Sequence, residues 1–248
     1  MSTVAAARPV RARLGRWPFD DEVVHLSLLD HHMVPTATDV AGWMAMAAAR
    51  NARLLRTGAL FPNSVEAFLE AGFEVADTLA LLVGTPAHLA TAHLSIPHRS
   101  GAHRSGDEPN ARMRRLRPSM LSEAAAIDRR AFPAPWANDA IALGDILAAT
   151  PHHRSRSVHV DGRMVAFCIS GRADQYGYIQ RLAVDPTMQR RGFALTLLDD
   201  AVRWMIRRDV QQVMLNTAVD NLPALALYES IGLHRQADPL LVLELSLR

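Results

Sequence analysis

Residues 189–194, Gln-Arg-Arg-Gly-Phe-Ala, have the composition of an anion-binding turn at the start of a helix. A strand-like run, 182–184, precedes them, and Asp185-Pro186 ends that run. From Ala194 onward, apolar residues recur at the spacing of one buried helical face. The first N–H groups of a helix lack internal partners, and a glycine lets a ligand approach them closely. We therefore predict a seat for phosphate or pyrophosphate formed by six residues, with a ligand-free basic helix start as the alternative: Gln189, Arg190, Arg191, Gly192, Phe193 and Ala194.

The pattern Q-x-x-G-x-A after this L-A-V strand resembles the acetyl-CoA loop of the GNAT superfamily of N-acetyltransferases, Q/R-x-x-G-x-G/A. The matching positions are Gln189, Gly192 and Ala194. A second block of the family follows in the expected order: Asn221, Ala224, Leu227-Tyr228-Glu229 and Gly232-Leu233. Two ordered blocks make the resemblance specific for the C-terminal part of the chain.

The resemblance implies an enzyme that uses acetyl-CoA as co-substrate, without a metal. An amine would attack the thioester directly in a ternary complex, and the acceptor would be a primary amine of a small molecule or a protein. By the same resemblance, the backbone of Leu182 and Val184 binds the pantetheine arm, Asn221 lies beside that arm, and Tyr228 protonates the leaving thiolate. The alternatives are a buried core aromatic for Tyr228 and a helix N-cap for Asn221, a role that could coexist with binding.

The general base is not visible in the sequence. Many family members carry a glutamate where Tyr178 stands, and the ribosomal-protein N-terminal acetyltransferases, which share a segment like 132–136, carry one where Asn216 stands. Either the amine arrives neutral, or water chained through Tyr178, Gln180 or Asn216 takes the proton, or the base comes from elsewhere. The missing glutamate also supports a rival hypothesis, a CoA-binding regulatory or scaffold protein with little or no turnover.

Composition narrows the class of protein. The chain has 248 residues, of which 49% are hydrophobic and 21% charged, with a formal net charge of +2 and a pI of about 9.2. This small net charge does not indicate a nucleic-acid partner, and the concentration of basic residues in 112–117 and 190–208 favours local anion binding. No run approaches the roughly 18 apolar residues of a membrane span. We expect a cytoplasmic protein with no membrane partner, and a homodimer stays open.

The elements that would position these residues follow in GNAT order, so we expect an α/β fold with a mixed, mostly antiparallel sheet flanked by helices. The single cysteine, Cys168, lies in an apolar run and is expected to be a buried structural thiol. The expected strands are 113–117, 155–160, 164–172, 177–184, 212–217 and 240–247, and the expected helices are 121–132, 138–149, 194–209 and 223–231.

The N-terminal half repeats part of this order at a spacing near 160 residues. The run 65–73 parallels 225–233, with Phe68 where Tyr228 stands, and Leu29 and His32 stand where Gln189 and Gly192 do. This half therefore resembles a degenerate, partial GNAT-like domain that does not bind CoA in the family manner.

The predicted domain limits are a degenerate domain at 1–97, a linker at 98–111 and an acetyltransferase domain at 112–248. We expect residues up to about Pro18 to form a flexible arm. The cluster Asp30-His31-His32 has metal-ligating residue types but no obvious partner set, so we predict a polar loop and no metal site.

Overall fold

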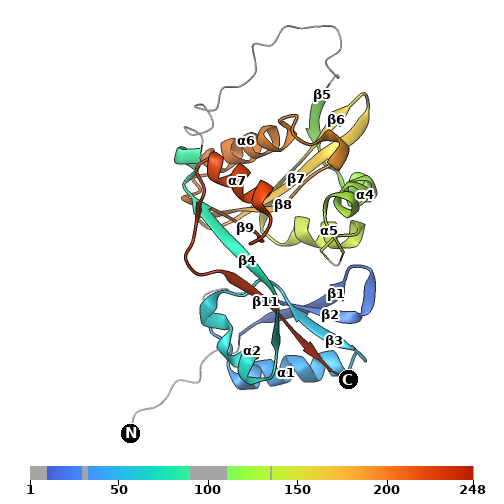
Figure 1. The fold of residues 1–248 in the computed structure, drawn as a ribbon, viewed down its shortest axis with the longest axis vertical. Coiled ribbons are helices and arrows are strands. Elements are labelled where there is room, and N and C mark those ends of the chain that lie inside the picture. The colour runs from blue at the N-terminus through green and yellow to red at the C-terminus, as the bar shows by residue number, and fades with distance from the viewer. Residues whose placement is uncertain (1–9, 30–32, 90–110, 135, 248) are drawn as a thin grey trace. The chain divides into compact units, whose positions relative to one another are not determined.

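The computed structural model describes residues 10–29, 33–89, 111–134 and 136–247, and these divide into two compact units (Figure 1). The first unit comprises Met1–Leu81, Asn216–Asp220 and Ala237–Arg248, and the second comprises Leu82–Leu215 and Asn221–Gln236. Among the helices of the described ranges, none is long and apolar enough to cross a membrane.

The division into units differs from the predicted domain limits at the C-terminal end. Residues 237–248, expected in the acetyltransferase domain, fall in the first unit. Most of the predicted linker, 98–110, and the cluster 30–32 lie outside the described residues. The predicted domain limits therefore stay a prediction.

The first unit is built on one sheet with helices packed on it. Its strands lie in the order β1, β2, β3, β11 and β4, and only the β2–β3 pair is parallel. The core contains Trp43 and Phe68, whose rings stack at 5.9 Å between centroids. The bounds are β1 Ala12–Trp17, β2 Asp20–Leu28, β3 Leu54–Thr57, β4 Glu74–Gly84, β11 Leu240–Ser246, α1 Ala37–Ala48, η1 Pro62–Ser64 and α2 Glu66–Glu70.

The expectation of a flexible arm up to Pro18 is wrong from residue 12 onward. Strand β1 pairs antiparallel with β2, from Ala12↔Leu28 to Trp17↔Asp20, and Trp17 is buried. Arg11 and Arg13 hid this strand in the sequence, although they alternate with Ala12 and Leu14, which pack on the core.

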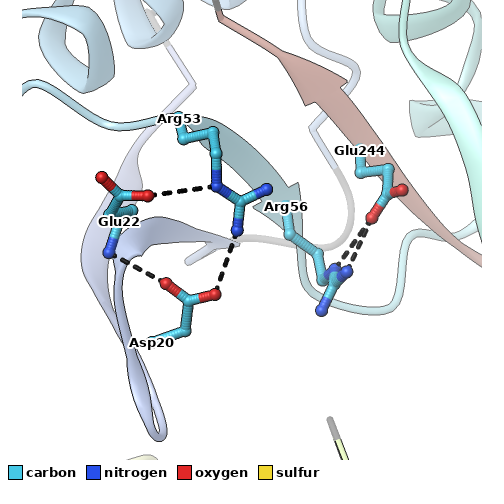
Figure 2. Close-up of polar contacts among 5 residues, drawn as sticks. All are labelled: Asp20, Glu22, Arg53, Arg56 and Glu244. Atoms are coloured by element: carbon cyan, nitrogen blue, oxygen red, sulfur yellow. Dashed lines mark hydrogen bonds and ion pairs between the residues drawn. The ribbon is translucent and has the colours of Figure 1, made fainter.

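Ion pairs flank the short strand β3 on both sides (Figure 2). Arg53 donates to Asp20 at 3.1 Å and to Glu22 at 3.2 Å, both on β2. Arg56 donates twice to one oxygen of Glu244 on β11, at 3.1 and 2.7 Å. The exposed Arg53 pairs contribute little, whereas the half-buried Arg56 pair strengthens the β3–β11 contact.

The second unit has a sheet in the order β9, β8, β7, β6 and β5, in which only β8–β9 is parallel. The two-residue strand β10 pairs with Leu82 and Val83 at the end of β4. The bounds are β5 Ala111–Arg115, η2 Pro118–Met120, α4 Leu121–Ala131, α5 Ala140–Ala148, β6 His152–Val160, β7 Arg163–Ala173, β8 Tyr176–Val184, η3 Pro186–Met188, α6 Phe193–Ile206, β9 Gln212–Ala218, α7 Leu222–Ser230 and β10 His234–Arg235.

Helices cover this sheet on both faces (Figure 1). Phe167 and Ile169 of β7 pack against α4 and α5, while α6 buries its apolar side, including Leu198 and Met205, on the sheet. Asp161 and Gly162, both with positive φ, form a tight turn between β6 and β7. A 3₁₀ turn precedes α4, whose N-cap is Met120.

Candidate active site

Helix α6 begins with backbone N–H groups that no residue of the helix accepts from. Its N-cap is Gly192, at φ +82°, and no side chain caps the helix. The first intrahelical bond runs from the N–H of Thr196 to the carbonyl of Gly192 at 3.0 Å, so the N–H groups of Phe193, Ala194 and Leu195 have no partner in the helix. A Cβ added to Gly192 would meet nothing within 4 Å, so the space before these donors is open. An anion there would gain both hydrogen bonds and the helix dipole.

Hydrogen bonds to Asp185 stabilise the turn that leads into α6. The buried carboxylate of Asp185 accepts bonds from the N–H and hydroxyl of Thr187, at 3.1 and 2.7 Å, and from Arg130 at 2.7 Å. Gln189, Arg190 and Arg191 are exposed. The predicted residues thus meet at one helix start, with two arginines adding positive charge there.

The corresponding helix of the first unit starts differently. Thr36 is the N-cap of this helix, α1. The hydroxyl of Thr36 accepts from the N–H of Asp39 at 3.2 Å, and the Asp39 carboxylate accepts from the N–H of Thr36 at 2.9 Å. Thr36 and Asp39 thus form a capping box at the start of α1. That the N-terminal half does not bind CoA stays a prediction.

Strands β8 and β9 pair over only part of their length. Their parallel pairing runs from Tyr176↔Gln212 to Tyr178↔Met214, whereas β8 continues to Val184. Leu182 and Val184 pair on the other side with Cys168 and Ala166 of β7. Within the described residues, the β9 side of this stretch has no strand partner, so its backbone groups can bond to an extended ligand.

The parallel pair of the first unit has no such opening. Its pairing runs from Val23↔Leu54 to Leu26↔Thr57, and β2 ends at Leu28. The backbone N–H of Gly58 then donates to the carbonyl of Leu26 at 2.7 Å. The two units thus share a parallel strand pair, but among the described residues the unpaired stretch of β8 beside its parallel partner has no counterpart in the β2–β3 pair.

Tyr228 lies on α7 and is buried, with 8% of its surface exposed. Burial raises the pKa of its phenol and the nearby Cys168 raises it further, while the charge of Arg181 lowers it. No hydrogen bond to its hydroxyl occurs among the described residues. A phenol in this environment is protonated at neutral pH, as a proton donor must be. Its catalytic role stays a prediction.

Cys168, which lies close enough to Tyr228 to affect the pKa of its phenol, is fully buried. Burial, and then the charge of Asp200, raises the pKa of its thiol to about 12. The thiolate is the nucleophilic form of cysteine. The expected structural role of Cys168 therefore fits its environment.

Asn221 caps helix α7. Its side-chain oxygen accepts from the N–H of Ala224 at 3.4 Å, and its backbone carbonyl accepts from Leu225 at 3.0 Å. The N-cap offered as the alternative is therefore present. Contact of Asn221 with the pantetheine arm stays a prediction.

The residues discussed as sources of the base differ in environment. Burial raises the pKa of Tyr178, as do Tyr176 and Asp174, which makes its phenol a poor base at neutral pH. The side-chain oxygen of Gln180 is buried and accepts no hydrogen bond from the described residues. It could accept one from a water molecule. Asn216 is exposed and belongs to the first unit.

Sequence reasoning missed an ion pair that joins α4 to β8. The fully buried carboxylate of Asp128 accepts two bonds from Arg181, both at 2.7 Å, and one from the N–H of Asn138 at 2.6 Å. Arg181 also donates to the carbonyl of Trp136 at 2.9 Å, and its guanidinium lies 3.5 Å from the centre of the Phe132 ring. A charge of each sign within apolar runs, AAAIDRRAF and YIQRLAV, was the available signal.

Three comparisons with known proteins bear on this site. The model of the Acetyltransferase (GNAT) family matches residues 121–233. The [Ribosomal protein bS18]-alanine N-acetyltransferase of Escherichia coli (strain K12) is 30% identical over 112 residues, which are 45% of this chain and 73% of that protein. N-alpha-acetyltransferase 30 of Xenopus laevis is 41% identical over 59 residues, 24% of this chain and 22% of that protein.

Solved structures extend the likeness in fold. A tandem GNAT protein from the clavulanic acid biosynthesis pathway aligns with a TM-score of 0.65 at 14% identity, over 98% of this chain and 81% of that one. A GCN5-related N-acetyltransferase from Kribbella flavida aligns with a TM-score of 0.58 at 16% identity, over 95% of this chain and 89% of that one. The predicted fold class is thereby confirmed.

Proposed function

This chain belongs to the GNAT family of acetyltransferases, and we propose that it transfers the acetyl group of acetyl-CoA to a primary amine by direct attack in a ternary complex. The observation that carries this proposal is the unpaired edge of β8, from Ile179 to Val184, which leads into the uncapped start of α6. An extended amide-rich arm that ends in a pyrophosphate needs both features in this order.

Each part of the site then has one task. The N–H groups from Phe193 onward, with Arg190 and Arg191, bind the pyrophosphate, and Gln189 borders that seat. The backbone of Leu182 and Val184 aligns the pantetheine arm, which fixes the thioester for attack. Asn221 lies beside the arm while it caps α7.

Proton transfers complete the reaction. Tyr228 donates its proton to the thiolate as the C–S bond breaks, and the charge of Arg181 favours the phenolate that is left. A water molecule takes the proton of the amine. The buried side-chain oxygen of Gln180 accepts a hydrogen bond from this water and so holds it in place. This route needs no carboxylate at the positions of Tyr178 and Asn216.

For the acceptor we favour the N-terminal amine of a protein over a small molecule. The support is that one relative is named an alanine N-acetyltransferase of a ribosomal protein and another an N-alpha-acetyltransferase. The free thiol of Cys168 fits a reducing compartment, and we place the activity in the cytoplasm.

Calorimetry with acetyl-CoA and a thiol-release assay test the proposal together. The assay covers peptides with different N-terminal residues, alanine included, and a panel of small primary amines. We expect acetyl-CoA binding and thiol release that depends on an acceptor. Binding without release for any acceptor would favour the alternative, a CoA-binding regulatory or scaffold protein. An absence of binding in the folded protein would refute both.

A further inference from the structure

The arginine-rich segment 112–117 has no role in the proposed acetyl transfer, but one of its arginines, Arg115, lines a hollow. A hollow of about 230 Å³ lies on the second unit, and we call it the basic hollow. It is lined by Arg115 of β5, His153, Arg154, Ser155 and Arg156 of β6, and Trp204 of α6.

The basic hollow is separate from the start of α6. Trp204 lies in the last turn of the helix, twelve residues after Gly192. At 1.5 Å per residue, this places it about 18 Å along the helix from the pyrophosphate seat. A ligand in the hollow would therefore not occupy the acetyl-CoA site.

The basic hollow has more arginine side chains than carboxylates to pair with them. Asp200 accepts from Arg154 at 2.6 and 2.7 Å and lies 3.4 Å from Arg156. Arg115 makes no ion pair with any residue in the described ranges. Three guanidinium groups thus face a single carboxylate. These bonds use the Nε and Nη2 groups of Arg154, which leaves its Nη1 available to another acceptor.

We propose that the basic hollow is a second anion site, which binds the phosphoryl group of a small phosphorylated molecule. Guanidinium groups from two neighbouring strands can donate to several oxygens of one phosphate, a geometry that favours phosphate over a carboxylate. The small volume, and the presence of Arg114 on the opposite face of β5 from Arg115, favour a compact ligand over a nucleic-acid strand.

Nuclear magnetic resonance of the full chain tests this site with inorganic phosphate as the probe. The protein is saturated with CoA, so that the α6 start is occupied, and phosphate is titrated against chloride at constant ionic strength. The readout is the indole N–H resonance of Trp204, assigned with Trp204→Phe. We expect a saturable shift of this resonance with phosphate but not with chloride, and no shift of the Trp43 indole in the first unit.

Two matched variants distinguish phosphate binding in the basic hollow from non-specific attraction to positive charge. Arg115→Ala should weaken phosphate binding by at least about tenfold, because it removes one charge-assisted contact. Arg114→Ala removes the same charge from the opposite face of the same strand and should leave binding unchanged. CoA affinity, measured for both, checks that the second unit is folded and tests the acetyl-CoA seat independently. Equal loss in the two variants, or no saturable Trp204 shift in the wild type, would overturn the proposal.

Discussion

Replacing Asp128 by alanine should cost far more stability than the loss of an ordinary ion pair. The change removes a fully buried carboxylate that accepts three hydrogen bonds, and it leaves the Arg181 guanidinium, only 16% exposed, without its counter-charge. Breaking a buried pair by removing one partner costs about 3–5 kcal/mol. We expect a loss in that range for Asp128→Ala, and a smaller loss for Asp128→Asn, which keeps the volume and one acceptor.

The matched control is Asp199→Ala on the surface of α6. Asp199 pairs with Arg203 at 2.8 Å, one helical turn away, and the Arg203 side chain is 60% exposed. Such a pair contributes only about 0.3–0.5 kcal/mol. Urea unfolding, followed in parallel by tryptophan fluorescence and circular dichroism, gives both free-energy changes and shows whether the transitions coincide. If the two alanine variants differ by less than about 1 kcal/mol, the buried ion pair does not stabilise this unit as argued.

Three further predictions concern the site. Gly192→Arg should abolish acetyl-CoA binding, because the arginine side chain would fill the open space before the first N–H groups of α6, and a φ of +82° strains any residue with a side chain. Unchanged acetyl-CoA affinity in a folded variant would show that the pyrophosphate does not bind at Gly192. Tyr228→Phe should lower kcat at least about tenfold with unchanged CoA affinity, and equal turnover would remove the phenol from the mechanism. Burial alone would raise the pKa of Asp185, but bonds from Thr187 and Arg130 bring it below its ordinary 3.8. Its contribution to the free energy of unfolding is therefore present above about pH 3.8 and lost as the pH falls through the lower folded-state pKa. Asp185→Asn should flatten this acid dependence, and an unchanged slope would contradict the assignment.

Local periodicity was enough to locate most elements of the second unit. The helix after Gly192 and strands β6 and β7 occur where the residue pattern predicted them, because their signals lie within a few residues. The phosphate seat and the role of Tyr228 were predicted from two short blocks with fixed spacing, and both stay predictions.

Features that depend on distant residues were not predictable in the same way. The sequence shows Asp128 and Arg181 as isolated charges, and nothing local indicates that residues 53 positions apart form one ion pair. The final strand was read as part of the acetyltransferase domain, yet β11 lies between β3 and β4. Strand pairing is set by the whole sheet, which local sequence patterns do not reveal.

The place of β11 has a consequence for the order of folding during synthesis. β11 pairs with both β3 and β4, and its Leu243 N–H donates to Thr57, 186 positions earlier. Strands β1 to β4 of the first unit are translated before most of the second unit. The strand between β3 and β4 is missing until β11 has been translated. Until then β3 and β4 each present an unpaired edge, which is a hazard for aggregation. Residues 1–97 expressed alone would keep that gap permanently, whereas the same fragment mixed with a peptide covering β11 has the means to close it.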